Sequence, residues 1–110
     1  MLKRRNDFQR VYRKGKSLAN RYFVLYVFES EELDGKVGFA AGKKLGCAVQ
    51  RNRAKRLLRE SYRLHSHELR PGIALLLVAR RPLLDVKCNV VEKAFLSLGK
   101  KAGIFSTDKE

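Results

Sequence analysis

The sequence predicts one domain of the α/β (α+β) sandwich class, in which helices pack on a central sheet in the order α-β-β-β-α-β-α. Three observations support this class. The chain has 110 residues, the size of one domain. Its residues are 45% hydrophobic, which allows a sizeable core. Its apolar residues follow the period of a strand in some segments and that of a helix in others. We expect the single domain to span residues 1–110, with residues 1–4 and 100–110 frayed.

The N-terminal segment has the pattern of a short amphipathic helix. Asp7 can cap a helix over residues 8–14, and Gly15 can end it. Three of its apolar residues recur at spacings of three and four and therefore share one face: Phe8, Val11 and Tyr12. Basic residues occupy the rest of the helix surface.

Two strands are predicted next. Residues 22–28 are aromatic and β-branched, which is typical of a strand. Residues 29–35 are acidic and rich in turn formers, so they predict a hairpin loop. Residues 36–41 would then form the returning strand, and a short third strand is predicted near residues 47–49.

The second half of the chain begins with a long helical pattern. Residues 52–69 predict a helix that Pro71 and Gly72 stop. One side of this helix carries Ala54, Leu57, Leu58, Ser61 and His65. Residues 73–79 form a continuous apolar run, which predicts a strand covered on both faces.

A last helix follows, and Asp85 or Asn89 could cap it. Its apolar residues are Val90, Val91, Ala94, Phe95 and Leu98. The tail after Gly99 is polar, and we expect it to fray.

The charge of the chain indicates a polyanionic partner. Lys and Arg number 25 against 11 Asp and Glu, which gives a net charge of +14. Nucleic acid and an anionic membrane both fit this charge. The longest apolar runs, residues 22–28 and 73–79, are too short to span a bilayer. The basic N-terminus is not followed by the apolar segment of a signal peptide. We therefore expect a cytoplasmic protein with no membrane partner.

The most informative segment is residues 43–63, where a single acid, Glu60, stands among eight basic residues. The basic residues are Lys43, Lys44, Arg51, Arg53, Lys55, Arg56, Arg59 and Arg63. A solvated helix face usually mixes charges of both signs, because like charges four residues apart repel. Selection for an anionic partner explains such repulsion, whereas solubility alone does not. The excess of Arg suits bidentate contacts with phosphate.

Residues 43–60 resemble the "RNR motif" of the bacterial ribonuclease P protein family. The match runs through Lys43, Lys44, Leu45, Gly46 and then through residues 48–60 with little interruption. Residues 2–17 resemble the N-terminal element of that family, residues 19–26 its first strand, and residues 78–82 the end of an apolar strand. The resemblance covers nearly the whole chain apart from the acidic loop and the tail.

The resemblance implies a division of labour within a ribonucleoprotein that removes the 5′ leader of precursor tRNA. The RNA subunit carries the active site and requires Mg²⁺, and the protein needs no cofactor of its own and no protein partner. The residues implied to contact the catalytic RNA are Lys43, Lys44, Arg51, Asn52, Arg53, Lys55, Arg56, Arg59 and Arg63. The family fold also includes a left-handed βαβ crossover, which the sequence itself cannot show.

The resemblance further implies a leader-binding cleft between the N-terminal helix and the sheet, with Phe8, Tyr12, Lys16 and Tyr26 as its residues. Aromatic rings can stack on bases without a strict sequence requirement. Spacing alone favours core packing for Phe8 and leaves the two tyrosines open, because a tyrosine keeps a polar tip. The resemblance favours the cleft.

The sequence offers no candidate catalytic residue and no metal site. Carboxylates are few, so a two-metal nuclease site within the protein is not expected. His65 and His67 are two residues apart on a helix and cannot chelate one metal. Cys47 and Cys88 are expected to be reduced. The alternative function is that of a ribosomal or other structural RNA-binding protein; a DNA-binding helix-turn-helix lacks its tight helix pair here.

Overall fold

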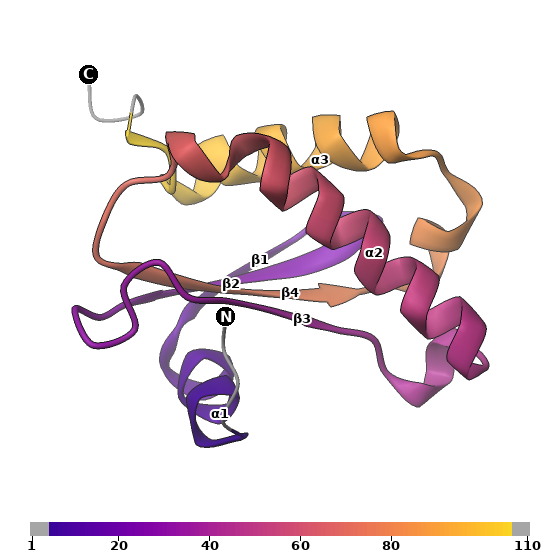
Figure 1. The fold of residues 1–110 in the computed structure, drawn as a ribbon, viewed down its shortest axis with the longest axis horizontal. Coiled ribbons are helices and arrows are strands. Elements are labelled where there is room, and N and C mark those ends of the chain that lie inside the picture. Colours follow the sequence, from indigo (N-terminus) through magenta and orange to yellow (C-terminus); the bar gives the residue numbers. More distant parts are fainter. Residues whose placement is uncertain (1–4, 107–110) are drawn as a thin grey trace.

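The element types follow one another as predicted, α-β-β-β-α-β-α, although one of the three strands before the second helix lies elsewhere in the sequence, and the α+β class is confirmed. The computed structural model describes residues 5–106 (Figure 1). Its helices are α1 (Arg5–Lys14), α2 (Ala48–His65) and α3 (Cys88–Ala102). Its strands are β1 (Lys16–Ala19), β2 (Phe23–Glu29), β3 (Val37–Ala40) and β4 (Ile73–Ala79).

The four strands form one sheet in the order β1-β2-β4-β3. β4 is antiparallel to β2 on one side and parallel to β3 on the other. All residues of β4 are apolar, and nearly all are buried, as the continuous apolar run predicted. The position of β4 is therefore explained by its composition, because a central strand has both edges paired and both faces covered.

The helices divide the core into two layers, with α2 and α3 on one face of the sheet and α1 on the other (Figure 1). Successive side chains of β2 point to opposite faces of the sheet, so this strand contributes to both layers of the core. Phe23, Leu25 and Val27 join the larger core beneath α2 and α3. Tyr26 and Phe28 pack against the smaller core beneath α1. The buried members of that smaller core are Val11, Leu33, Ala74 and Leu76.

Gly15 lets the chain turn from α1 directly into β1. A Cβ atom at Gly15 would lie 2.6 Å from the carbonyl oxygen of Val11 and 2.8 Å from that of Val27. Only glycine fits between these two backbone groups. The junction therefore holds the end of α1 against the sheet.

The connection from β3 through α2 to β4 is a left-handed crossover. In Figure 1, β3 lies in front of β4, both strands run from left to right, and α2 returns above the sheet. This sense is opposite to that of most parallel crossovers. It agrees with the expectation that came from the family resemblance.

The prediction of a hairpin over residues 22–41 is wrong. β2 and β3 are not neighbours in the sheet, because β4 lies between them. Residues 30–36 therefore connect two strands that each pair with β4. Local turn chemistry predicted the loop correctly but could not show that a later strand, with higher apolar content, occupies the central place.

The predicted strand near residues 47–49 is also wrong. Cys47 is the N-cap of α2, and its backbone N–H donates to Oε1 of Gln50 at 2.9 Å. The remaining strand of the sheet is β1, at the edge next to β2. Most residues of β1 are exposed, so it lacks the apolar alternation from which a strand is predicted.

Several predicted helix ends need correction. Asp7 lies in the first turn of α1 and not before it. α2 begins at Ala48 and ends at His65, and Ser66–Glu68 add a short 3-10 turn before Pro71. Lys87 is the N-cap of α3, so neither Asp85 nor Asn89 caps that helix.

The prediction that residues 100–110 fray is wrong for residues 100–106. α3 continues to Ala102, and Gly103 ends it in the left-handed conformation with φ 69°. Ile104 and Phe105 are then buried, and Phe105 bridges to Leu69. These two apolar residues close the larger core. The predictions for residues 1–4 and 107–110 lie outside the described residues.

Candidate nucleic-acid interface

Three of the predicted leader-binding residues meet where α1 lies on the sheet. The ring centroids of Tyr12 and Tyr26 are 5.0 Å apart, with the rings tilted by 36°. Phe8, one turn before Tyr12 on α1, packs against the same small core as Tyr26. We call Phe8, Tyr12 and Tyr26 the aromatic surface. Its two tyrosines come from different elements, so the packing of α1 on the sheet creates it.

The exposure of Tyr12 distinguishes the aromatic surface from ordinary core packing. Tyr12 is 58% exposed, while Phe8 and Tyr26 are half-buried. Burial raises the pKa of Tyr26, and the neighbouring Tyr12 raises it further. Tyr12 thus presents a ring to solvent above a partly buried ring that holds it in place. Such an arrangement suits stacking with a base.

The structure does not bring Lys16 to the aromatic surface. In the register of β1 with β2, Ser17 lies opposite Tyr26, and Lys16 lies opposite Val27. Paired residues of an antiparallel ladder share a face, and the side chain of Val27 belongs to the core on the other face. Lys16 instead lines a cavity at the sheet edge together with Lys101.

Arg10 is held by contacts within the chain. Its Nη1 donates to Oε2 of Glu32 at 3.2 Å, and its guanidinium carbon lies 5.6 Å from the ring centroid of Phe28. The acidic loop between β2 and β3 therefore neutralises one cation of α1. Arg13 and Lys14, also on α1, are exposed.

α2 separates its apolar residues from its charges as predicted. Ala54, Leu58 and Ser61 face the sheet and are fully buried. The hydroxyl of Ser61 donates to the carbonyl oxygen of Leu57 at 3.0 Å, which satisfies this polar group inside the core. The exposed polar and basic residues of the opposite side are Asn52, Arg53, Arg56, Arg59 and Arg63. We call these five residues the basic helix face.

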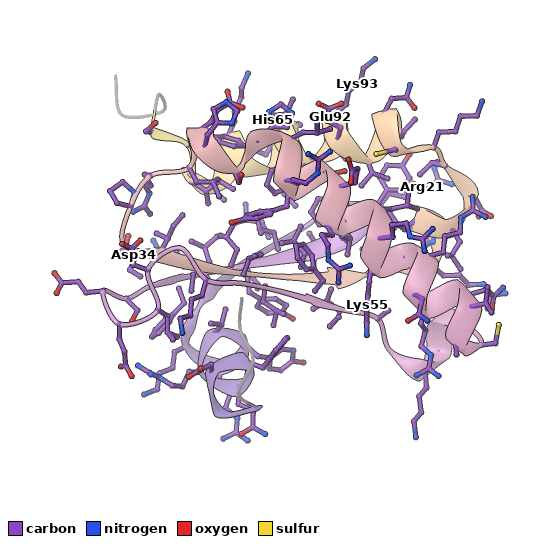
Figure 2. The ribbon with its side chains drawn as sticks, viewed as in Figure 1. Arg21, Asp34, Lys55, His65, Glu92 and Lys93 are labelled. Atoms are coloured by element: carbon purple, nitrogen blue, oxygen red, sulfur yellow. The ribbon has the colours of Figure 1, made fainter. Side chains whose placement is uncertain are left out.

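Two arginines of the basic helix face have partners within the chain. The guanidinium of Arg59 lies 5.7 Å from the ring centroid of Phe39. Arg63 pairs with Glu60, and this hydrogen bond lowers the pKa of the Glu60 carboxyl. Lys55 is half-buried and extends from α2 toward the sheet edge at β3 (Figure 2). Arg51 is also half-buried, and its Nε has no hydrogen-bond partner within residues 5–106.

A basic cavity of 300 Å³ connects the start of α2 with the face that carries α1. It is lined by Gly42, Lys44, Leu45, Val78, Ala79, Arg80 and Arg81. Val78 packs against the same small core as Tyr26, while Lys44 belongs to the segment that precedes α2. Lys43 and Lys44 are both exposed. Sequence reasoning missed Arg80 and Arg81, because a short basic pair after a strand resembles an ordinary strand end.

No catalytic constellation is evident in the part of the chain that the structure describes. Residues 5–106 contain no group of three or more His, Cys, Asp or Glu side chains that could hold a metal ion. Cys47 and Cys88 are both free thiols. His65 is paired with two carboxylates, Glu68 and Glu92. Among the same residues, no helix is long and apolar enough to span a membrane.

Comparisons with known proteins agree with this arrangement. The Ribonuclease P family model matches residues 1–103. A ribonuclease P protein component from Pelotomaculum thermopropionicum is 42% identical over 104 residues, which are 94% of this chain and 93% of the relative. One from Natranaerobius thermophilus is 43% identical over 101 residues, or 92% of this chain and 88% of the relative.

Solved structures show the same likeness. The RNase P protein of Staphylococcus aureus superposes with a TM-score of 0.83 at 36% identity, covering 96% of both chains. The RNase P protein from Thermotoga maritima superposes with a TM-score of 0.76 at 30% identity, covering 88% of this chain and 92% of the other. The chain therefore belongs to the ribonuclease P protein family, the RNA-binding protein components of a ribonucleoprotein endonuclease that processes tRNA.

Proposed function

We propose that this protein binds the catalytic RNA of ribonuclease P through the basic helix face and the 5′ leader of precursor tRNA through the aromatic surface. Cleavage then takes place in the RNA subunit, which holds the Mg²⁺ ions. The single observation that carries the proposal is the exposed ring of Tyr12 beside the tilted ring of Tyr26. A ring that served only the core would be buried.

The basic helix face supports the first contact. Its arginines project from a helix whose other side is anchored in the core, so the charges are held at fixed spacing. Phosphate contacts of this kind release counterions and therefore weaken as salt rises. The neighbouring Lys43 and Lys44 extend the charged area toward the aromatic surface by way of the 300 Å³ cavity.

The distribution of carboxylates supports placing the chemistry in the RNA. Within residues 5–106, the acids near the aromatic surface include Glu32, which pairs with Arg10. On α2 the acid Glu60 pairs with Arg63. These acids therefore neutralise arginines and do not converge on a metal site. The protein contributes positive charge, which can replace part of the cation atmosphere and so lower the Mg²⁺ that the RNA requires.

The test replaces Tyr12 with leucine, which removes the ring and keeps most of the apolar bulk. The holoenzyme is reconstituted with a bacterial ribonuclease P RNA, and its affinities for precursor and mature tRNA are compared. Loss of one stacked base costs about 1–3 kcal/mol, or about 5- to 150-fold in affinity for the precursor. Affinity for mature tRNA, which lacks a leader, should not change.

Tyr22→Leu is the matched control, because Tyr22 is half-buried and packs on the larger core, on the opposite face of the sheet. It should leave both affinities unchanged. Equal losses for precursor and mature tRNA in Tyr12→Leu would contradict leader stacking. Nuclease activity of the purified protein without RNA would contradict the placement of the active site.

A further inference from the structure

A second basic cavity lies at the edge of the sheet, where residues from both faces line it. Its volume is 350 Å³. It is lined by Lys14, Lys16, Leu18, Val27, Phe28, Glu29, Arg70, Lys101 and Ala102. These residues come from the α1–β1 junction, the end of β2, the segment before β4 and the last turn of α3. Three separate parts of the chain therefore bring cations to one place.

The cations that line this edge cavity differ in whether they have a partner within the chain. Nε of Arg70 donates to the carbonyl oxygen of Gly103 at 2.7 Å, and its Nη2 donates to Glu29 at 3.1 Å. Arg70 is thus fixed and neutralised. Lys14, Lys16 and Lys101 are exposed and have no ion pair with any residue in the range 5–106. Three lysines therefore remain available to an anion.

The floor of the edge cavity is apolar. Val27 is 6% exposed, and the half-buried Leu18 lies two residues after Lys16 on the same side of β1. Ala102 closes the cavity from α3. A simple anion would need only the lysines, whereas this cavity pairs a cationic rim with an apolar surface. That combination fits a phosphate joined to a sugar and base.

We propose that the edge cavity binds one nucleotide of the precursor tRNA leader, beyond the nucleotides on the aromatic surface. Lys14, Lys16 and Lys101 hold its phosphate, and Leu18 and Val27 contact its sugar or base. This inference rests on the proposed function, because it extends the same leader. β1 is an edge strand with Ser17 beside Tyr26 on one face and Lys16 on the other. A single RNA strand can therefore pass round β1 from the aromatic surface to the edge cavity.

The first measurement uses the full chain without RNA and adenosine 5′-monophosphate as the probe. The expected result is a saturable NMR shift of the Leu18, Val27 and Ala102 methyl signals. The double variant Lys16→Gln, Lys101→Gln should weaken this binding by roughly 2- to 30-fold, the effect of two exposed ionic contacts. Lys93→Gln is the control, because Lys93 lies on the outer side of α3 (Figure 2). Absence of a shift at these methyl groups would overturn the proposal.

The second measurement uses the holoenzyme and two precursor tRNAs, one with a short leader that ends on the aromatic surface and one longer by a few nucleotides. The double variant should lose affinity only for the longer leader, and its salt slope should fall by about 0.7 for the phosphate that is no longer neutralised. A response to the mononucleotide without any effect of leader length would overturn the assignment to RNA, since the cavity would then take a free nucleotide.

Failure of this inference is distinguishable from failure of the proposed function. Tyr12→Leu should weaken binding of both leaders, because the aromatic surface is occupied in each. If Tyr12→Leu has this effect and the double variant has none, the edge cavity is excluded while the proposed function stands. If Tyr12→Leu has no effect on either leader, the proposed function fails, whatever the mononucleotide does.

Discussion

His65 joins the end of α2 to α3, and its replacement should weaken the fold in a pH-dependent way. Nδ1 of His65 lies 2.5 Å from Oε2 of Glu68, and Nε2 lies 2.7 Å from Oε2 of Glu92 on α3 (Figure 2). A neutral imidazole has one N–H, so both carboxylates accept hydrogen bonds only when the ring is protonated. The hydrogen bond to Glu68, followed by that to Glu92, raises the pKa of His65 above its ordinary value.

The size of the effect follows from the exposure of the three side chains. His65 is 16% exposed, but Glu68 is 44% and Glu92 is 32% exposed. Water therefore screens both contacts, and they belong near the upper end of the range for exposed ion pairs. His65→Gln should cost about 1 kcal/mol in the free energy of unfolding at slightly acid pH. In a domain of this size such a loss lowers Tm by roughly 4–8 °C.

The dependence on pH has a definite sign. Because the folded pKa of His65 is raised, its contribution is fully present below the unfolded value of about 6.5 and is lost as pH rises through the folded pKa. The stability difference between wild type and His65→Gln should therefore be largest near pH 6 and decline above about pH 6.5. The charge of His67 also lowers the pKa of Glu68, so a variant at His67 is compared with the variant at His65.

Urea unfolding, monitored by circular dichroism at several pH values between about 5.5 and 9, measures this difference in stability. His67→Gln is the matched control, because His67 is exposed two residues further along the chain. It should change stability little at any of these pH values. A difference for His65→Gln that stays constant, or that grows with rising pH, would refute the argument.

Two further predictions concern the cations of α2 and the packing of the tail. A fourfold alanine variant of α2 should bind the ribonuclease P RNA less tightly, with a salt slope reduced by about 0.7–0.9 per lost phosphate contact, while thermal unfolding changes little. Its positions are Arg53, Lys55, Arg56 and Arg59. Wild-type affinity at physiological salt would mean that another face binds the RNA. Gly99→Ala should cost about 1–3 kcal/mol in urea unfolding, because its Cβ would lie 2.6 Å from the ring of the buried Phe105. Gly42→Ala, which meets open space, should cost little, and equal stabilities of the two variants would exclude the steric explanation.

The elements that the sequence predicted well are those whose signal is local. β4 has the predicted bounds, because residues 73–79 are all apolar and Gly72 and Arg80 mark their ends. The apolar side of α2 was also predicted, because the residues that it buries, such as Ala54 and Leu58, recur at helical spacing in the sequence. Handedness of the crossover came from the family resemblance alone.

The elements that the sequence could not predict carry too weak a local signal. β1 carries little apolar alternation because it is an exposed edge strand, so its antiparallel pairing with the predicted strand β2 was missed. The burial of Ile104 and Phe105 was missed because two apolar residues are too few for a periodic signal.

In the candidate site, too, features with a local sequence signal were predicted, and a feature that depends on strand register was not. The basic helix face was predicted from like charges at helical spacing, and the structure leaves these residues exposed. Tyr12 and Tyr26 lie together as the resemblance implied. Lys16 does not join them, because the face on which it lies depends on the register of β1 with β2. A shift of one residue in that register would have placed Lys16 beside Tyr26.

The central position of β4 has a consequence for the order in which the protein can be made. A ribosome produces β2 and β3 well before β4, and neither can pair with the other in the native sheet. Until residue 79 has emerged, β2 and β3 each keep an unpaired strand edge. Among the described residues, the β1–β2 hairpin is the native strand pairing that can form before then. α1 also lacks much of the apolar surface on which it packs, since Ala74 and Leu76 belong to β4. The aromatic surface therefore forms only after most of the chain has been synthesised, so a nascent chain cannot present it early.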